Sequence, residues 1–340
     1  MKTVAEEWID YVLQLYPYEV EETILLSVKK DEKIWNVKTD QGDKTLKQMA
    51  VRPERMLFYK EAHLHLQKQR FPIAKLCPTK NGGLCVGGGG FVYELYDEVS
   101  GSDVSYYNID QLVRAMRFLG RFHQASQGFT PSKAGKKRNR LGKWHKSYLW
   151  NLQQLQGYKK VATHFTDDPF SLLFLEKVDQ MLEMGNEALR LLETSAYAEW
   201  TSGSEKWNGF IHKDISLSSF AEVDGEIWIK TPPPIAIDLP PRDIRNLLNK
   251  VMKKMAVWDD HLAVQLLRSY DSTYPLTKQQ YLILQADLLF PHLFTSVIQK
   301  YYLEQKKTWS DEKYMWELQT SIVVEETKVK MLENLIKEVT

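Results

Sequence analysis

The order of secondary-structure patterns constrains the fold of this 340-residue chain more than any single motif does. In the first hundred residues, three short β-type runs precede a helical pattern, and two further β-type runs follow it. These runs are TILLSV (23–28), IWNVKT (34–39), KTLKQM (44–49), LCVGG (84–88) and FVYELYDEV (91–99). Short runs joined by turn residues such as DQGD are typical of antiparallel strands. We therefore expect an antiparallel sheet that carries one helix.

Helical spacing occurs twice in this β-rich region. Apolar side chains recur every three or four positions over residues 4–16 and predict a short N-terminal helix. The helix carried by the sheet is predicted to follow Pro53, because proline is common in the first turn of a helix.

From Ile109 onward the pattern becomes mainly helical. Further helices are predicted over residues 147–160, 171–195, 245–270, 277–304 and 311–338. Among them, FIHKDIS (210–216) and EIWIKT (226–231) predict two short strands, with VDGE as a hairpin turn. The sequence thus predicts an α+β protein with a β-rich lobe at 1–100, a mainly helical lobe at 101–340 and a hinge near 97–103.

The charge balance argues against a nucleic-acid or membrane-surface protein. The 45 basic and 44 acidic residues give a net charge of +1, which implies no general attraction to polyanions. The basic stretch SKAGKKRNRLGKWHK (132–146) has only Trp144 as an aromatic neighbour, so a solvated connector is expected there.

Neither a membrane span nor a disulfide framework is expected. The most apolar segment, residues 281–303, is interrupted by charged and polar side chains and by Pro291. The chain has two cysteines, Cys77 and Cys85, which fits synthesis in a reducing cytosol.

Four residues have the chemistry and order that phosphoryl transfer requires. Such catalysis needs a lysine on the nucleotide phosphates, an acid that holds this lysine, and an aspartate near the acceptor hydroxyl. Lys47 ends a predicted strand, and Glu61 follows fourteen positions later in a predicted helix. In the His212-x-Asp214 motif, Asp214 would orient and deprotonate the acceptor, and His212 would brace the loop. Taken alone, Lys47 and Glu61 are better explained as two surface charges than as a catalytic pair.

Four longer stretches, in order along nearly the whole chain, carry a family resemblance. The chain resembles the aminoglycoside phosphotransferase and choline kinase superfamily and, more narrowly, the CotS-type spore coat proteins of the YutH-like branch. The stretches are FLGRFHQASQGF (118–129), LGKWHKSYLWNLQQLQGYKK (141–160), FIHKDISLSSF (210–220) and DLPPRDIRNLL (238–248). The resemblance implies a protein-kinase-like two-lobe fold, synthesis in the cytoplasm with the spore coat as destination, and other coat proteins as partners.

Against this family pattern, both metal-binding positions carry hydroxyl side chains. Related kinases have an Asn five residues after the catalytic Asp, and that position is Ser219 here. They also have a metal-binding Asp on the next hairpin strand; if DLPPRD (238–243) matches the family's GDPxxD-type segment, that position is Thr231. Since Mg²⁺ prefers anionic oxygen ligands, phosphoryl transfer would lose much of its charge stabilisation.

A second register makes Asp238 the metal ligand. It would insert seven residues, including the prolines at 232–234, between the catalytic loop and the metal strand.

The strands expected to cover the nucleotide phosphates also depart from the family pattern, because SVKKDEKIWNV (27–37) contains no glycine that would let backbone amides approach a phosphate. The GGGG run (87–90) is expected to be a hairpin turn.

Three hypotheses follow. The leading one is a coat-associated pseudokinase with a structural or scaffolding role, which needs no cofactor and binds neither nucleic acid nor membrane. The alternative is an active phosphotransferase that uses ATP, Mg²⁺, Asp214 and Asp238 on a small hydroxyl-bearing substrate or a protein. The third is a pseudokinase that binds nucleotide without turnover.

Overall fold

A computed structural model gives the structure of the chain and describes residues 4–29, 32–133, 138–204, 206–306 and 308–339. The chain forms two compact units, each assembled from three segments. The sheet unit consists of Met1–Asn108, Ala125–Asn139 and His212–Ala236, and the helical unit consists of Ile109–Gln124, Arg140–Ile211 and Ile237–Thr340. The hinge expected at 97–103 lies inside the sheet unit.

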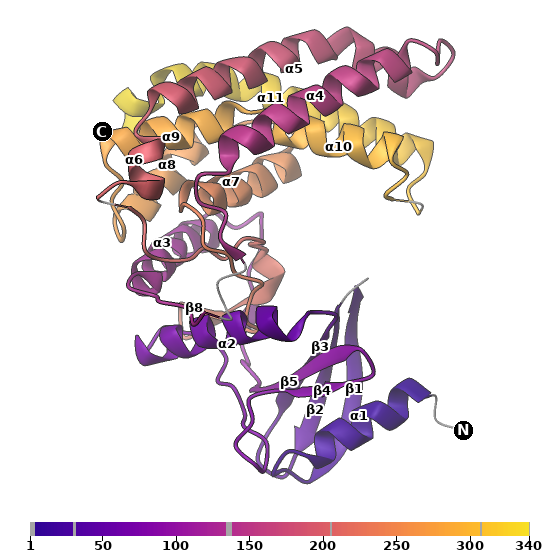
Figure 1. The fold of residues 1–340 in the computed structure, drawn as a ribbon, viewed down its shortest axis with the longest axis vertical. Coiled ribbons are helices and arrows are strands. Elements are labelled where there is room, and N and C mark those ends of the chain that lie inside the picture. The colour runs from indigo at the N-terminus through magenta and orange to yellow at the C-terminus, as the bar shows by residue number, and fades with distance from the viewer. Residues whose placement is uncertain (1–3, 30–31, 134–137, 205, 307, 340) are drawn as a thin grey trace. The chain divides into compact units, whose positions relative to one another are not determined.

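The sheet unit is built on a five-stranded antiparallel sheet in the order β1-β2-β3-β5-β4 (Figure 1). Its strands are β1 (Val20–Lys29), β2 (Glu32–Thr39), β3 (Lys44–Met49), β4 (Val86–Gly88) and β5 (Phe91–Asp97). In the ladders, Ile34 lies opposite Lys47, and Lys47 lies opposite Glu94. All five expected β-type runs form strands, which confirms the antiparallel sheet.

Helices cover both faces of this sheet. Helix α1 (Val4–Gln14) packs Val12 and Leu13 into a cluster that includes Leu95 of β5. Helix α2 (Pro53–Lys68) packs Met56 against Val92, also on β5. Because successive side chains of a strand point to opposite faces, the two helices lie on opposite sides of β5. Lys47 lies on the side of α2, as does Glu94.

A second, three-stranded sheet in the same unit has the order β6-β7-β8. It consists of β6 (Ser102–Asp103), β7 (Phe220–Val223) and β8 (Glu226–Ile229). Asp224 and Gly225 form the hairpin turn, with φ values of 50° and 80°. The expected hairpin is therefore present, but its first strand begins at Phe220 and not in FIHKDIS. That segment is irregular because Lys213 has a φ of 70°, which an extended strand does not allow.

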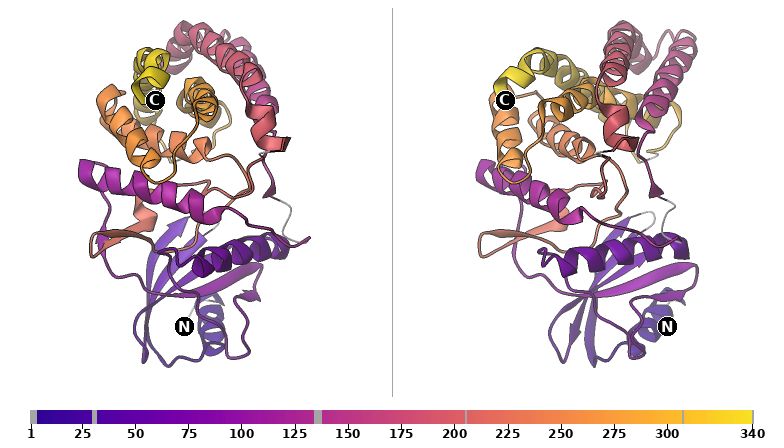
Figure 2. Two further views of the ribbon diagram at one scale, coloured as in Figure 1. Left: turned by 90° about the vertical axis from the view of Figure 1, so that its left-hand side faces the viewer. Right: turned by 60° about the vertical axis from the view of Figure 1, so that its left-hand side comes forward.

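The helical unit contains most of α3 and eight further helices among the described residues (Figures 1 and 2). Helices α4 and α5 lie side by side, and α9 contacts α5. The helices are α3 (Ile109–Ser126), α4 (Trp144–Ala162), α5 (Pro169–Thr194), α6 (Tyr197–Ser202), α7 (Pro241–Met255), α8 (Asp260–Asp271), α9 (Lys278–Leu289), α10 (His292–Tyr302) and α11 (Asp311–Val339).

Two of the expected helices are each divided in two. The helix expected at 245–270 ends at Ala256, whose left-handed conformation (φ 58°) terminates α7. The helix expected at 277–304 is divided at Pro291, because proline cannot continue the backbone hydrogen bonding of α9.

Taken together, α9 and α10 (Lys278–Tyr302) form the one helical stretch within the described residues that is long and apolar enough to cross a bilayer. Of its most apolar window, 72% is buried inside the protein, as in a core helix.

Candidate functional site

Lys47 is buried on β3, and its ammonium is already bound by the protein. Its side chain is only 3% exposed, and its Nζ lies 2.9 Å from Oε2 of Glu32. The same Nζ donates a hydrogen bond to the carbonyl oxygen of Pro232 at 3.1 Å. Glu32 can reach Lys47 because it lies two residues before Ile34, the residue directly opposite Lys47 in the β2–β3 ladder. The neighbouring turn residues Lys30 and Asp31 lie outside the described residues, as do residues 134–137 of the basic stretch.

The contact with Pro232 brings Lys47 next to the end of the β7–β8 hairpin. Ile229 anchors this hairpin: its N–H donates to Pro72 O at 3.1 Å, and its carbonyl accepts from Ala74 N at 2.9 Å. Two residues after Ile229 comes Thr231, which is half-buried and directly precedes Pro232. Thr231, one of the two expected metal positions, is therefore the neighbour in sequence of the residue whose carbonyl binds Lys47.

Glu61 does not contact Lys47. Its Oε2 accepts a hydrogen bond from the backbone N–H of Ser132 at 3.0 Å. The preceding residue, Lys60, forms a buried ion pair with Glu94, which lies directly opposite Lys47 on β5. Helix α2 thus presents a cation to a strand carboxylate, where the sequence predicted an acid presented to a strand lysine.

The Lys60–Glu94 pair belongs to a small buried network. Lys60 donates to the hydroxyl of Tyr96 at 3.1 Å, and that hydroxyl donates to Glu94. Burial lowers the pKa of Lys60, an effect that Glu94 opposes. Sequence reasoning missed both charges. The available signal was an acidic residue in the middle of FVYELYD, an otherwise apolar and aromatic strand.

Asp214 lies on a tight turn that buried neighbours hold in place. The Asp214 side chain is exposed, and its backbone N–H donates to His212 O at 2.9 Å. Ile211 and Ile215 are fully buried on either side, and the buried His212 ring packs edge-on against Phe220 with centroids 5.8 Å apart. An exposed carboxylate on a backbone held in this way is able to accept a proton from a hydroxyl group.

Ser219 uses its hydroxyl inside the loop. Its Oγ donates to Ser216 O at 2.6 Å, and its N–H donates to the same carbonyl at 3.0 Å. Its own carbonyl accepts from the backbone N–H of Lys230 at 2.9 Å, which ties the loop to the strand that ends near Thr231. The two hydroxyl-bearing positions are therefore connected through the hairpin.

Asp238 lies in the helical unit just before α7 and is almost fully buried. Its Oδ1 accepts from Trp144 Nε1 at 2.8 Å and from Leu239 N at 3.0 Å, and its Oδ2 lies 3.1 Å from Arg242 Nε. The Arg242 guanidinium also lies over the Trp144 ring, 5.0 Å from its centroid. Burial raises the pKa of Asp238, and the charge of Arg242 opposes that rise. These contacts fix the start of α7.

Two family-specific segments meet inside the helical unit. His123, from FLGRFHQASQGF, is fully buried, with Nδ1 2.8 Å from the hydroxyl of Tyr270 and Nε2 3.3 Å from Oδ2 of Asp243 in DLPPRD. His123 therefore packs in the interior of the helical unit. Within the described ranges, no group of three or more His, Cys, Asp or Glu side chains is arranged to hold a metal ion.

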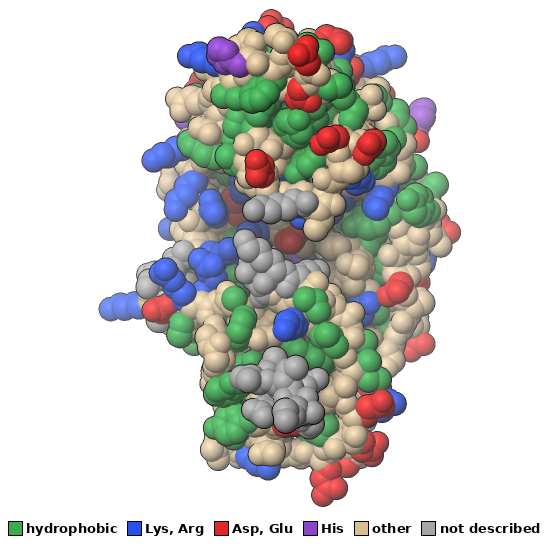
Figure 3. Space-filling view, turned by 90° about the vertical axis from the view of Figure 1, so that its right-hand side faces the viewer, with side chains coloured by type: hydrophobic (Ala, Val, Ile, Leu, Met, Phe, Trp, Pro, Cys, Tyr) green, Lys and Arg blue, Asp and Glu red, His purple; other side chains and the backbone are tan. Residues whose placement is uncertain are grey.

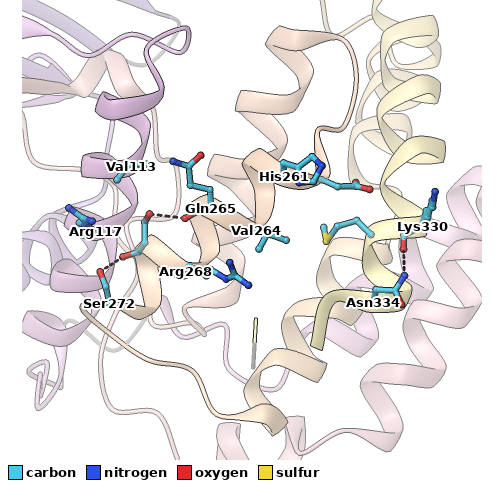
Figure 4. Close-up of a pocket in the computed structure, with 12 residues that line it drawn as sticks. Val113, Arg117, His261, Val264, Gln265, Arg268, Ser272, Lys330 and Asn334 are labelled. Atoms are coloured by element: carbon cyan, nitrogen blue, oxygen red, sulfur yellow. Dashed lines mark hydrogen bonds between the residues drawn. The ribbon is translucent and has the colours of Figure 1, made fainter. Parts of the chain in front are cut away.

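A separate cleft of about 610 Å³ lies between α3, α8 and α11 (Figure 4). Arg117, Arg268 and Lys330 contribute positive charge to it, one from each helix, and Asp260 contributes a carboxylate. None of the residues predicted for phosphoryl transfer lines this cleft.

The antiparallel sheet with its buried lysine, the Asp214 loop with its following hairpin, and the helical unit define a kinase-like protein. A family model described as spore coat putative kinase YutH matches residues 19–335. The chain belongs to this family, which confirms the resemblance found in the sequence. Spore coat protein S of Bacillus subtilis (strain 168) is 48% identical over 334 residues, covering 98% of this chain and 95% of that protein.

Solved structures confirm the fold class. An aminoglycoside phosphotransferase from Alicyclobacillus acidocaldarius superposes with a TM-score of 0.75 at 20% identity, covering 97% of this chain and 96% of the other. Spectinomycin phosphotransferase APH(9)-Ia, solved with ADP and spectinomycin, gives a TM-score of 0.62 at 9% identity, covering 94% and 97%. At these identities the likeness concerns the fold alone.

Proposed function

We propose that the protein is a coat-associated kinase-like protein in which phosphoryl transfer is impaired and whose role in the coat is structural. Membership of a spore coat family supports the coat as its destination and other coat proteins as its partners. The aromatic content, 12% of residues, suits adhesive packing in a protein layer.

The state of Lys47 carries the proposal. A lysine ammonium has three donors, and here Glu32 and Pro232 O engage it while it is nearly excluded from solvent. A nucleotide phosphate would have to displace the Glu32 carboxylate or share the ammonium with it. Sharing brings two anions together, which costs electrostatic energy that increases with burial. Glu32 would therefore compete with a phosphate group for the Lys47 ammonium.

The expected metal positions support the same conclusion. Ser219 donates its hydroxyl proton to Ser216 O, and Thr231 also offers only a neutral hydroxyl. Mg²⁺ in kinase sites is usually held by one or two carboxylates together with substrate phosphates. Asp238, the alternative ligand, is engaged by Trp144 and Arg242.

An active phosphotransferase is the second candidate, and the exposed, well-held Asp214 favours it. In this candidate Asp214 accepts the proton of a substrate hydroxyl, whose oxygen attacks the γ-phosphorus of ATP while ADP leaves. ATP and Mg²⁺ are then required, with Asp238 as the carboxylate for the metal. Related folds have been solved with ADP, which is compatible with this candidate.

The test is ATP turnover by the purified full chain in the presence of Mg²⁺. We expect the wild type and Asp214→Asn to release ADP at the same rate as a protein-free control. Asp214 is exposed, so the substitution leaves the fold intact, which circular dichroism verifies. Metal-dependent turnover that Asp214→Asn abolishes would overturn the proposal, whereas metal-independent nucleotide binding without turnover would favour a nucleotide-binding pseudokinase.

A further inference from the structure

A cavity of about 650 Å³ opens at one end of the helical unit, among the start of α5, the end of α10 and the start of α11. Five aromatic side chains contribute to its wall: Phe165, Tyr301, Tyr302, Trp309 and Tyr314. The predicted phosphotransfer residues are all elsewhere, so the cavity is unrelated to the candidate site described above.

Four of the five rings in the aromatic wall pack against one another. Tyr301 stacks on Phe170 with centroids 3.8 Å apart and planes 16° apart. Tyr314 meets Tyr301 edge-on at 5.2 Å, and Trp309 packs on Tyr314 at 5.1 Å. Since the rings hold one another in place, a ligand that contacts them need not order them first, which reduces the entropic cost of binding.

Carboxylates outnumber cations in the lining. Asp168, Glu304 and Asp311 line the cavity together with one lysine, Lys306. Asp168 accepts hydrogen bonds from Ser171 Oγ at 2.6 Å and from Tyr301 Oη at 3.0 Å. Partial burial by itself would raise the pKa of Asp168, but these hydrogen bonds lower it, so the carboxylate is charged at neutral pH. Glu304 and Asp311 are exposed.

The same end of the unit already shows ammonium groups over aromatic rings. Lys313 Nζ lies 3.9 Å from the centroid of Trp316, and Lys300 Nζ lies 5.4 Å from that of Trp309. Among the described residues, no such contact involves Phe165, Tyr301 or Tyr302. In Figure 3, the upper part of the surface shows hydrophobic side chains interspersed with acidic ones.

We propose that this cavity binds an organic cation: a protonated amine or guanidinium, carried either by a free amine or by a lysine or arginine side chain of a polypeptide. Aromatic faces attract cations through their quadrupole, and the effect increases as the cation loses water. The three carboxylates supply the opposite charge and disfavour an anionic ligand. The proposal does not depend on nucleotide binding or on the state of Lys47.

The test is calorimetric titration of the full chain with two probes, propylammonium and a short lysine-rich peptide, at physiological ionic strength. The pocket variant is Glu304→Gln with Asp311→Asn, two exposed substitutions that preserve side-chain shape. Its matched control is Glu183→Gln with Glu333→Gln, which removes the same charge from exposed helical positions outside the cavity. Phe165→Ser tests the aromatic wall at a half-exposed side chain.

We expect saturable binding with one site per chain, roughly fivefold weaker in the pocket variant and in Phe165→Ser, and unchanged in the control. Binding of both probes would identify a free amine as sufficient, and binding of the peptide alone would identify a polypeptide side chain as the source. Saturable binding of neither probe, or equal weakening in the pocket variant and the control, would overturn the proposal.

Discussion

The ammonium of Lys60 on α2 forms a buried ion pair with Glu94, the residue directly across the β3–β5 ladder from Lys47. Lys47 and Lys60 therefore lie on one side of the sheet, and each has its own acid: Glu32 for Lys47 and Glu94 for Lys60. Both acids come from strands. Helix α2 therefore contributes the cation and the sheet contributes the carboxylate, whereas the expected Lys47–Glu61 pair had the carboxylate on the helix.

The buried pair makes a prediction about stability. Removing one partner leaves a buried charge without compensation, so Lys60→Met and Glu94→Gln should each lower the free energy of unfolding by about 3–5 kcal/mol. The double variant should be less destabilised than the sum of the two, which denaturant unfolding of all four proteins measures. As a control, Lys38→Met in the exposed Lys38–Glu22 pair should change stability little. Strict additivity of the two buried substitutions would contradict the assigned pair.

The metal positions make a second prediction. Restoring both expected ligands with Ser219→Asn and Thr231→Asp, and releasing Lys47 with Glu32→Gln, should create Mg²⁺-dependent stabilisation by ATP. Binding to the native state raises its stability by mass action, so the readout is the change in melting temperature with MgATP. The matched control substitutes Ser218→Asn and Lys230→Asp in place of the two ligand changes. If MgATP raised the melting temperature of the wild type as much as that of the restored variant, the assignment of Ser219 and Thr231 as lost metal ligands would be contradicted.

Two histidines, the buried His63 and the partly buried His292, predict a loss of stability in acid. Burial lowers the pKa of His63 and that of His292 to about 3 each, with help from the charges of Lys60 and Arg245 respectively. Between pH 6.5 and about 3 the unfolded chain therefore binds more protons than the native state, and stability falls as pH falls. Each histidine should contribute a slope of about 1.4 kcal/mol per pH unit in that range.

Replacing these histidines should flatten the acid limb of the stability curve. Urea unfolding of His63→Gln with His292→Gln between pH 7 and pH 4 measures the slope, and the exposed His164→Gln is the control. An acid limb with the same slope in the double variant would contradict the prediction.

A structural role in the coat makes a prediction in spores. Asp214→Asn should enter the coat in wild-type amounts, because a structural role does not depend on a catalytic carboxylate and the Asp214 side chain is exposed. Leu247→Asp places a charge at a fully buried core position and should remove the protein from the coat. Immunoblots of coat extracts measure both. Coat incorporation that fails with Asp214→Asn would indicate that activity matters.

The sequence was sufficient for most of the fold. Alternating runs and turn residues predicted all five strands of the main sheet, because their pattern is local. The helix breaks were harder. Pro291 is present in the sequence, but the apolar stretch around it has the pattern of a single helix. Ala256 adopts a left-handed conformation, which a sequence pattern predicts for glycine and not for alanine.

The candidate site was less predictable because its contacts are set by register. Asp214 and His212 form a local motif, so the sequence alone singles them out as candidates. The partner of Lys47 depends on which residue of β2 lies opposite it, and the charged side chain of α2 that meets the sheet depends on the rotation of that helix. A shift of one residue, from Glu61 to Lys60, reverses the charge that the helix presents.

Thermal unfolding with and without ATP, each with and without Mg²⁺, tests most directly whether Glu32 and the hydroxyl positions have replaced nucleotide and metal binding. A ligand at 100 times its Kd stabilises the native state by about 2.7 kcal/mol, enough to raise the melting temperature measurably. We expect no shift in melting temperature at millimolar ATP in the wild type or in Lys47→Ala. A shift that requires Mg²⁺ and vanishes in Lys47→Ala would contradict it.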